Sequence, residues 1–253
     1  MLFDLKQKYF QELELSVPLG YGLVCPLEFA EAWTSFTEIF VNDEYAPALQ
    51  QICLPQRWLD LGCHAGYFSL YLVWLRARIG LDNDFRALLI DGDSRVTTAV
   101  QKLIESNRLQ ERLEFQMGAI ATGASLKSFV ERPFMSSGTV SVSPSQTDGT
   151  VRQVPTLPAD QILKLLPAPY DLVKVDIEGG EYDFLMAYRP VLDQTRHLLL
   201  EWHSWHSGGG GPGQLKELLS DYGFELVLDI PTAHLADSAQ CGVWLLTKRA
   251  RID

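Results

Sequence analysis

The sequence predicts an α/β protein with a mostly parallel, seven-stranded sheet. Two observations carry this prediction. From residue 57 to residue 222, short apolar runs alternate with stretches of helical length, and a glycine turn follows the first run. The last two apolar runs, 224–229 and 241–248, have no helix between them. Strand–helix alternation implies parallel strands with right-handed crossovers, so the last pair predicts an antiparallel hairpin that closes the sheet.

Each element follows from its local pattern. In residues 1–52, apolar side chains recur every three to four positions, with a break near 18–21. This spacing predicts an N-terminal helical cap, which is followed by the main domain at 53–253. Strands are expected at 57–61, 86–91, 112–117, 170–176, 196–202, 224–229 and 241–248, and helices at about 66–79, 94–107, 180–192 and 213–222. Residues 119–160 predict an irregular insertion with weak β stretches at 139–142 and 150–154, either near a ligand or as a flexible surface loop.

Composition restricts the partners. The formal net charge of −11 argues against a nucleic acid or an anionic membrane as the main partner, because both require a basic surface. The longest clearly apolar run, 70–75, is far shorter than a membrane span. The four cysteines are scattered without a CxxC pair and are expected to be reduced thiols. We therefore expect a soluble, cytoplasmic protein with a small-molecule partner; its oligomeric state is left open.

The glycine turn in residues 57–69 predicts the ligand. Its glycines are Gly62 and Gly66, whereas a dinucleotide fingerprint would also need glycine where His64 and Tyr67 stand. S-adenosylmethionine has no phosphate, and its sulfonium and ammonium groups favour a nearby carboxylate, which Asp60 offers. The predicted cofactor-binding residues of this turn are Asp60, Gly62, Cys63, His64 and Gly66.

A second carboxylate stands at the end of the strand 86–91. Asp91 is placed to accept the ribose hydroxyls of an adenosine. The alternative is that Asp91 and Asp93 cap the helix that begins at Ser94; we assign ribose binding to Asp91 and capping or solvent exposure to Asp93. Gly118 and Ala119, which follow the strand 112–117, complete the predicted cofactor site together with Asp176.

The segment after residue 170 is the most specific in the chain. Because strand residues alternate between faces, Lys174, Asp176 and Glu178 point the same way. Three ionisable groups on one face of a central strand are too costly to be incidental. The pattern therefore indicates a functional site.

This segment, read as Lys-x-Asp-x-Glu-Gly-x-Glu from Lys174 to Glu181, resembles the hallmark of the FkbM family of S-adenosylmethionine-dependent methyltransferases. The resemblance covers about residues 36–205 and implies a class I methyltransferase fold with S-adenosyl-L-methionine as cofactor. Members are associated with O-methylation of natural products and sugars. The chain departs from the family at residues 62–64, where Gly-Ala-Asn is usual, and at 91–92, where Glu-Pro is common.

Aromatic and ionisable residues gather where the strand 196–202 ends, and glycines follow at 208–211. They are Glu201, Trp202, His203, Trp205 and His206. The group predicts a substrate lip beside a mobile loop, unless Trp202 belongs to the core and His206 is simply exposed. Glu201 and His203 share a face, and we predict a functional role for both.

Three functions compete. The first is methyl transfer from S-adenosylmethionine to an oxygen of a small molecule, with His203 as general base because the intrinsic pKa of histidine lies near neutrality. Asp176, Glu178 and Glu201 would position His203 or the acceptor. The second, less favoured, makes these carboxylates and His203 ligands of a divalent metal. The third is a non-catalytic adenosine-binding module.

Overall fold

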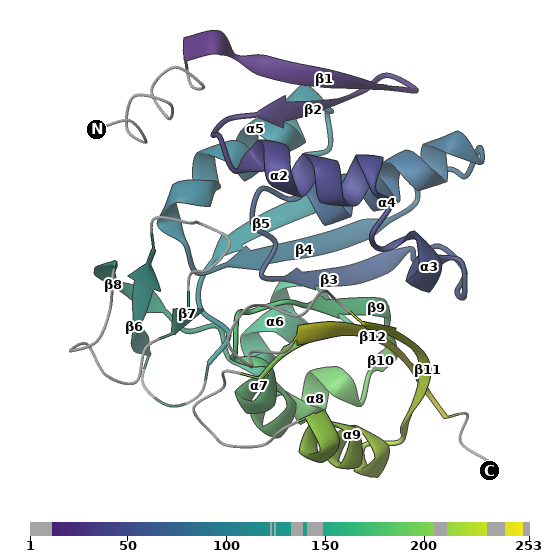
Figure 1. Ribbon diagram of the computed structural model, residues 1–253, viewed down its shortest axis with the longest axis vertical. Coiled ribbons are helices and arrows are strands. Elements are labelled where there is room, and N and C mark those ends of the chain that lie inside the picture. The colour runs from purple at the N-terminus through teal and green to yellow at the C-terminus, as the bar shows by residue number, and fades with distance from the viewer. Residues whose placement is uncertain are drawn as a thin grey trace.

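The structure, a computed structural model, describes residues 12–121, 123, 125–132, 139–140, 149–204, 212–231 and 241–249. Its centre is a seven-stranded sheet in the order β11-β12-β10-β9-β3-β4-β5 (Figure 1). The strands are β3 (Arg57–Leu61), β4 (Arg86–Asp91), β5 (Leu113–Met117), β9 (Tyr170–Val175), β10 (Thr195–His203), β11 (Phe224–Pro231) and β12 (Cys241–Lys248). Only β12 runs antiparallel to its neighbours, β10 and β11, among these strands. The predicted sheet and its closing hairpin are confirmed.

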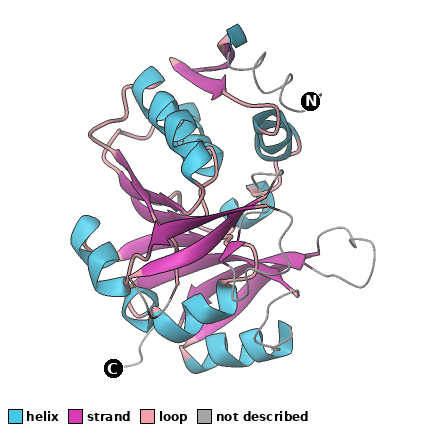
Figure 2. Cartoon of the chain, turned by 90° about the vertical axis from the view of Figure 1, so that its left-hand side faces the viewer, coloured by secondary structure: helices cyan, strands magenta, loops and turns pink. Residues whose placement is uncertain are grey.

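Helices cover both faces of this sheet (Figure 2). On one face, α4 (Tyr67–Arg78) and α5 (Thr97–Ser106) share a buried cluster with Trp58, Leu89 and Leu172. The opposite face packs Leu59, Val173 and their neighbours against a second set of helices. These are α6 (Ala159–Leu165), α7 (Glu181–Ala187), α8 (Arg189–Leu192) and α9 (Pro212–Asp221). Apolar residues on both faces of each inner strand explain the near-continuous apolar runs in the sequence.

Two predicted helices are divided. A 3₁₀ turn, η2 (Ser94–Val96), comes before α5, and the predicted helix 180–192 forms α7 and α8. The second division falls at Tyr188 because Pro190, in the first turn of α8, has no N–H to donate to the preceding turn.

Among the described residues, the helices of the N-terminal region lie mainly in its second half, although residues 12 and 13 are also helical. Residues 32–49 form α2 (Ala32–Phe36), a π-helical turn η1 (Thr37–Val41) and α3 (Ala46–Leu49). In contrast, β1 (Leu15–Gly20) and β2 (Leu23–Leu27) form an antiparallel hairpin, so the prediction of a helical cap is wrong for this stretch. Tyr21 and Gly22 both have positive φ, as a two-residue hairpin turn of type I′ requires. Residues 1–11 lie outside the described part of the chain.

The predicted irregular insertion contains regular secondary structure. Its described part forms a small antiparallel sheet of β6 (Leu126–Glu131), β7 (Thr139–Val140) and β8 (Thr150–Pro155). The Phe129 ring packs on Gly92, where an added Cβ would come within 2.6 Å of the ring. Ser94 Oγ donates a 2.6 Å hydrogen bond to Glu131 Oε1. These contacts favour the first of the two alternatives, an insertion beside the ligand edge of β4.

Candidate active site

The site lies at the carboxyl edge of the sheet, between β3 and β9. After β5 the chain crosses back over β4 and β3 to begin β9, and such a reversal of strand order creates a ligand crevice. Gly62 packs tightly against the backbone of Asp176, just after β9. Its φ is +75°, and an added Cβ would lie 1.6 Å from the carbonyl oxygen of Asp176. Glycine is required here both by the backbone angle and by the contact.

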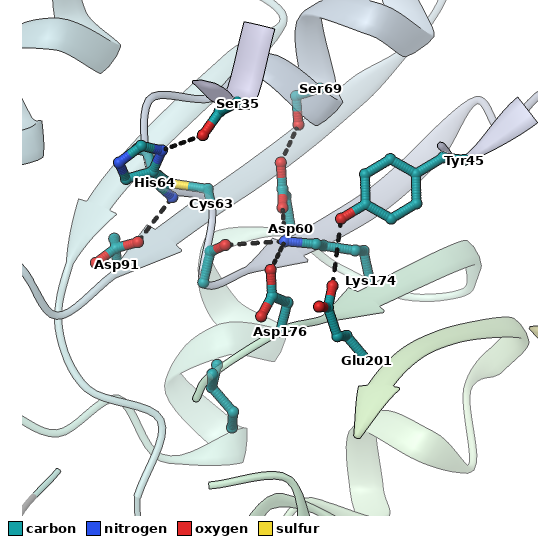
Figure 3. Close-up of polar contacts among 12 residues, drawn as sticks. Ser35, Tyr45, Asp60, Cys63, His64, Ser69, Asp91, Lys174, Asp176 and Glu201 are labelled. Carbon is teal, nitrogen blue, oxygen red and sulfur yellow. Dashed lines mark hydrogen bonds and ion pairs between the residues drawn. The ribbon is translucent and has the colours of Figure 1, made fainter. Parts of the chain in front are cut away.

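Asp91 is held by backbone N–H groups. His64 N donates to Asp91 Oδ2 at 2.7 Å, and Asp93 N donates to Asp91 Oδ1 at 2.8 Å (Figure 3 shows the first bond). Burial raises the pKa of Asp91 to about 6, although these two N–H groups oppose the rise. The carboxylate is fixed at the end of β4, and each oxygen keeps a lone pair for a ligand hydroxyl.

Asp93 has the other role that the sequence offers. Its carboxylate accepts the backbone N–H of Arg95 at 2.9 Å and caps the 3₁₀ turn η2. It also forms a buried ion pair with the Arg95 guanidinium. Capping is therefore confirmed for Asp93 and does not account for Asp91.

His64 adopts a left-handed backbone angle, φ +48°, in the middle of the glycine turn. Its Nδ1 lies 3.3 Å from Ser35 Oγ, and Phe29 packs edge-on against its ring. Burial, and then the charge of Lys174, lower the pKa of His64 to about 4, so the ring is neutral. Its Nε2 is buried without a hydrogen-bond partner among the described residues. An adenosine edge or hydroxyl would satisfy this atom.

Lys174 joins Asp60, the glycine turn and Asp176 (Figure 3). Its Nζ donates to Gly62 O at 2.9 Å and to Asp176 Oδ2 at 3.0 Å, and lies 3.7 Å from Asp60 Oδ1. Burial alone would lower the pKa of Lys174, but Asp176 and Asp60 raise it above its usual value. Lys174 is therefore a permanent cation between two carboxylates.

Asp60 is completely buried, with no exposed surface. Its Oδ2 accepts the Ser69 hydroxyl at 2.7 Å, and Ser69 in turn accepts the indole N–H of Trp58 at 3.0 Å. Burial raises the pKa of Asp60, while Lys174 and Ser69 oppose this. The carboxylate faces Ser69 on one side and Lys174 on the other. Asp60 therefore affects a ligand by positioning Lys174.

The remaining predicted cofactor residues act through backbone packing. Gly66 caps α4 in a left-handed conformation. Gly118 N donates to Asp91 O, and Ala119 N donates to Pro155 O, both at 2.8 Å. A Cβ at Gly118 would lie 2.6 Å from Leu157, and Cys63 is buried with its thiol directed to its neighbour's carbonyl. These four residues shape the pocket without offering a charged group.

A cluster of ionisable side chains lies at the ends of β9 and β10. Asp176, Glu178 and His203 place their ligand atoms within 4.8 Å of one another. Glu201 Oε1 lies 3.9 Å from His203 Nε2. The structure thus brings together the four residues that the sequence predicts to be catalytic.

Glu181 orients His203, a contact that the sequence reading missed. Its Oε1 lies 3.0 Å from His203 Nδ1 and also accepts the backbone N–H groups of Ile177 and Gly179. Burial alone would lower the pKa of His203, but Glu181, Asp176 and Glu178 raise it to about 10. The pKa of His203 in this site therefore lies above the intrinsic value on which its assignment as a base rested. His203 is a cation at neutral pH.

The pKa values of two carboxyl groups beside His203 are also raised, which for a carboxyl group favours the neutral form. Burial and then Asp176 raise the pKa of Glu178 to about 8. The same two causes raise the pKa of Glu201 well above its usual range. Glu178 also has a positive φ of 54°, a strained backbone for glutamate. The cluster therefore holds protons near neutral pH and can exchange them.

The N-terminal region forms a wall of the site through Tyr45, a residue that the sequence did not single out. Tyr45 OH donates to Glu201 Oε2 at 3.5 Å (Figure 3). Burial raises the pKa of both Glu38 and Glu44, and the charge of Asp176 raises both further; for Glu44, Glu38 also contributes, ahead of Asp176. The only sequence signal was the resemblance of residues 36–45 to the segment that precedes the turn in the FkbM family.

The aromatic lip is only partly described. Trp202 is buried and packs on Trp244 with ring centroids 5.3 Å apart, so Trp202 belongs to the core. Trp205, His206 and the glycines at 208–211 lie outside the described residues.

Within the described ranges, no helix has the length and apolar character needed to cross a bilayer.

Comparison with solved structures supports the fold. Magnesium protoporphyrin IX methyltransferase from Synechocystis PCC 6803, solved with bound S-adenosylmethionine, is 14% identical, with a TM-score of 0.51 over 85% of this chain and 81% of that one. TehB from Haemophilus influenzae is 12% identical, with a TM-score of 0.51 over 85% of this chain and 66% of that one. No curated protein shows significant sequence similarity to the chain.

The strand order, the antiparallel β12 and the glycine turn after β3 define a class I methyltransferase fold. The family model described as "Methyltransferase FkbM domain" matches residues 75–226, more than half of the 253 residues. The chain belongs to the FkbM methyltransferase family, and is an enzyme of the class that uses S-adenosylmethionine. The matched region starts within α4, so it contains the Lys174–Glu181 segment but not the glycine turn.

Proposed function

We propose that this methyltransferase transfers the methyl group of S-adenosylmethionine to a hydroxyl oxygen of a small molecule such as a natural product or a sugar. The observation that carries the proposal is the convergence of Asp176, Glu178, Glu201 and His203 beside the glycine turn. The chain carries a net charge of −11, which disfavours a nucleic-acid acceptor.

The cofactor half of the proposed site fits adenosine. Asp91 accepts the two ribose hydroxyls, and the orphaned Nε2 of His64 lies on the same turn. Gly62 and Gly66 allow a close approach of the backbone, and the buried Cys63, Gly118 and Ala119 complete the walls. Asp176, one-quarter exposed, faces the cationic end of the cofactor, and the direct contact expected for Asp60 becomes a positioning role through Lys174. Bound there, S-adenosylmethionine supplies the electrophilic methyl group.

In the acceptor half, the hydroxyl of the acceptor has to lose its proton. Glu178, with its pKa near 8, takes the proton of the acceptor hydroxyl, because a base is most effective when its pKa lies near the working pH. His203, kept cationic by Glu181, donates a hydrogen bond to the acceptor oxygen and stabilises its developing charge. Glu201, hydrogen-bonded to Tyr45, positions the acceptor. This exchanges the roles first expected for His203 and Glu178.

Paired acceptors test the choice of oxygen. We expect S-adenosylhomocysteine to form with a hydroxylated acceptor but not with the matched compound in which an amine replaces the hydroxyl, and the product should carry an O-methyl group by NMR. Preference for the amine would show that the enzyme is an N-methyltransferase. Turnover of RNA above that of every small acceptor would overturn the small-molecule assignment.

A metal-assisted reaction is the second candidate, because Asp176, Glu178 and His203 lie close enough to share an ion. Two carboxylates and an imidazole can bind a divalent cation, which would lower the pKa of the acceptor hydroxyl. We expect activity to survive EDTA, since Lys174 and His203 already neutralise the carboxylates. Loss of activity on chelation and recovery with magnesium would favour the metal.

We also propose that residues 53–253 act as one catalytic domain with residues 1–52 as its wall, and that the enzyme works in the cytoplasm. The four free cysteines and the acidic charge support this location. Fractionation of cells that express the full chain tests it; recovery with the membranes or in the medium would contradict it.

A further inference from the structure

An open cleft of about 470 Å³ lies at the amino ends of β3 and β4, opposite to the candidate active site. Three arginines line it, namely Arg57, Arg86 and Arg112. The apolar part of its wall comes from the end of α6 and the residues that follow it, including Leu165 and Pro167. A cleft of this volume is large enough for a metabolite. No step of methyl transfer uses it.

The three arginines form a row across adjacent strands. Arg57 and Arg86 are direct partners in the parallel register of β3 and β4. Arg112 stands next in the row, because its carbonyl accepts the N–H of Ala87 at 2.9 Å at the start of β5. The order β3-β4-β5 can be followed in Figure 1. Adjacent strands are about 4.8 Å apart, so the backbones of the three arginines are neighbours in one row, and the Arg112 guanidinium lies 5.9 Å from the centre of the Phe85 ring.

The described carboxylates near the row are not bonded to its guanidinium groups. Across the described ranges, no carboxylate forms an ion pair with any of the three guanidinium groups. Arg57 donates to Pro167 O at 2.5 Å and Arg112 donates to Asn83 O at 2.7 Å, both of which are neutral carbonyls. Asp171 is close, but it accepts the backbone N–H groups of Gln56 and Arg57.

Adjacent like charges destabilise a sheet, and a bound anion removes that cost. Guanidinium groups bind phosphoryl groups through paired, charge-assisted hydrogen bonds, and two neighbouring arginines match two neighbouring phosphoryl groups. Two glutamates, Glu111 and Glu114, also line the cleft and restrict it to a compact ligand rather than a nucleic-acid backbone. We infer that this arginine row is a binding site for a small molecule that carries a diphosphate group, with its organic part on the apolar wall.

Inorganic pyrophosphate is the probe, titrated into the full chain at low ionic strength by calorimetry. We expect it to bind at least about tenfold more tightly than orthophosphate. Arg86→Gln should weaken pyrophosphate binding by about tenfold to a hundredfold, as for other charge-assisted contacts. The matched control is Arg196→Gln, an exposed arginine near the start of β10 that does not line the cleft; it should bind like the wild type.

S-adenosylhomocysteine binding should be unchanged in Arg86→Gln, because residues 86 and 91 stand at opposite ends of β4, about 17 Å apart at 3.3 Å per residue. This binding also verifies that the variant is folded. Equal pyrophosphate affinity in the wild type, Arg86→Gln and Arg196→Gln, or equal affinity for pyrophosphate and orthophosphate, would overturn the inference. Neither result bears on the proposed O-methylation.

Discussion

Backbone groups carry the contacts above β3 and β4, whereas side chains carry those above β9 and β10. In the first half, Gly62 fits against a carbonyl oxygen, and Asp91 is fixed by two N–H groups. In the second half, Glu181 fixes His203, and the surrounding carboxyl groups shift one another's pKa. On the proposed function, the difference teaches that close packing shapes the cofactor half of the site and that charge shapes the acceptor half. Substitutions should separate accordingly into effects on affinity and effects on rate.

The largest effect is expected from Gly62→Ala. The new Cβ would stand 1.6 Å from Asp176 O, so the turn or β9 has to move. We expect S-adenosylhomocysteine binding to be lost and unfolding stability to fall by about 3 kcal/mol or more, as for other severe packing clashes. The measurements are calorimetry and denaturant unfolding.

Gly80→Ala is the matched control, because Gly80 has a similar φ of +72° but open space around an added Cβ. It should lose only the stability that a left-handed alanine costs, roughly 1–2 kcal/mol, and bind normally. If Gly62→Ala behaves like Gly80→Ala, close approach is not what the turn requires.

Glu178→Gln and His203→Gln probe the acceptor half. Removing a group that moves or stabilises the proton should lower kcat by roughly 10²- to 10⁴-fold. The affinity for S-adenosylhomocysteine should stay near that of the wild type, because neither side chain belongs to the cofactor half. An exposed glutamate on α5 gives the control Glu105→Gln. Near-normal turnover in both site variants would remove the cluster from the reaction.

Asp91→Ala tests the cofactor half of the site. Loss of charge-assisted hydrogen bonds worth roughly 1.5–3 kcal/mol should weaken S-adenosylhomocysteine binding about tenfold to a hundredfold. Asp93→Ala is the informative neighbour, because it removes a cap and should reduce stability by about 1 kcal/mol with little effect on affinity. Unchanged affinity in Asp91→Ala, or a preference of the wild type for NAD, would contradict the cofactor assignment.

The smallest expected effects are those of pH, and they differ between the halves. Asp91 is charged only above its pKa of about 6, so S-adenosylhomocysteine affinity should rise as pH increases through 6. Glu178 accepts a proton only when ionised, so kcat should rise through about pH 8 and lose this limb in Glu178→Gln. A rate limb near pH 10 that disappears in His203→Gln would restore His203 as the base.

Stability gives a separate check on His203. Its folded-state pKa of about 10 lies above the ordinary 6.5, so its ion pair with Glu181 stabilises the fold fully below about pH 6.5. That contribution should decrease as pH rises towards 10, and the decrease should be smaller in His203→Gln. Identical slopes of unfolding free energy against pH would show that the pair is not formed.

Local patterns predicted the sheet because its inner strands are apolar runs between turn signals, and β3, β4 and β12 have the predicted bounds. They failed at β1 and β2, because the helical spacing of the apolar residues that ends at Leu13 was extended into a stretch that forms strands. The hairpin depends on the turn at Tyr21 and Gly22, which was read as a break within a helix.

The candidate site shows the same limit. Strand alternation placed Asp176 and Glu178 together, and the carboxyl-end rule placed Asp91. Neither rule could show that the Asp60 carboxylate is enclosed by Ser69 and Lys174, because burial depends on the helix that covers the strand. Nor could either rule find Tyr45, which lies 156 positions before its partner Glu201.

The hydrogen bond between Tyr45 and Glu201 has a consequence for engineering. Tyr45 belongs to residues 37–49, which lie outside the sheet. The hydrogen bonds described for Gly62, Asp91 and Lys174 do not involve these residues. On the proposed function, libraries confined to Glu38, Glu44 and Tyr45 would therefore change acceptor selectivity while the hydrogen bonds of Gly62, Asp91 and Lys174 stay in place.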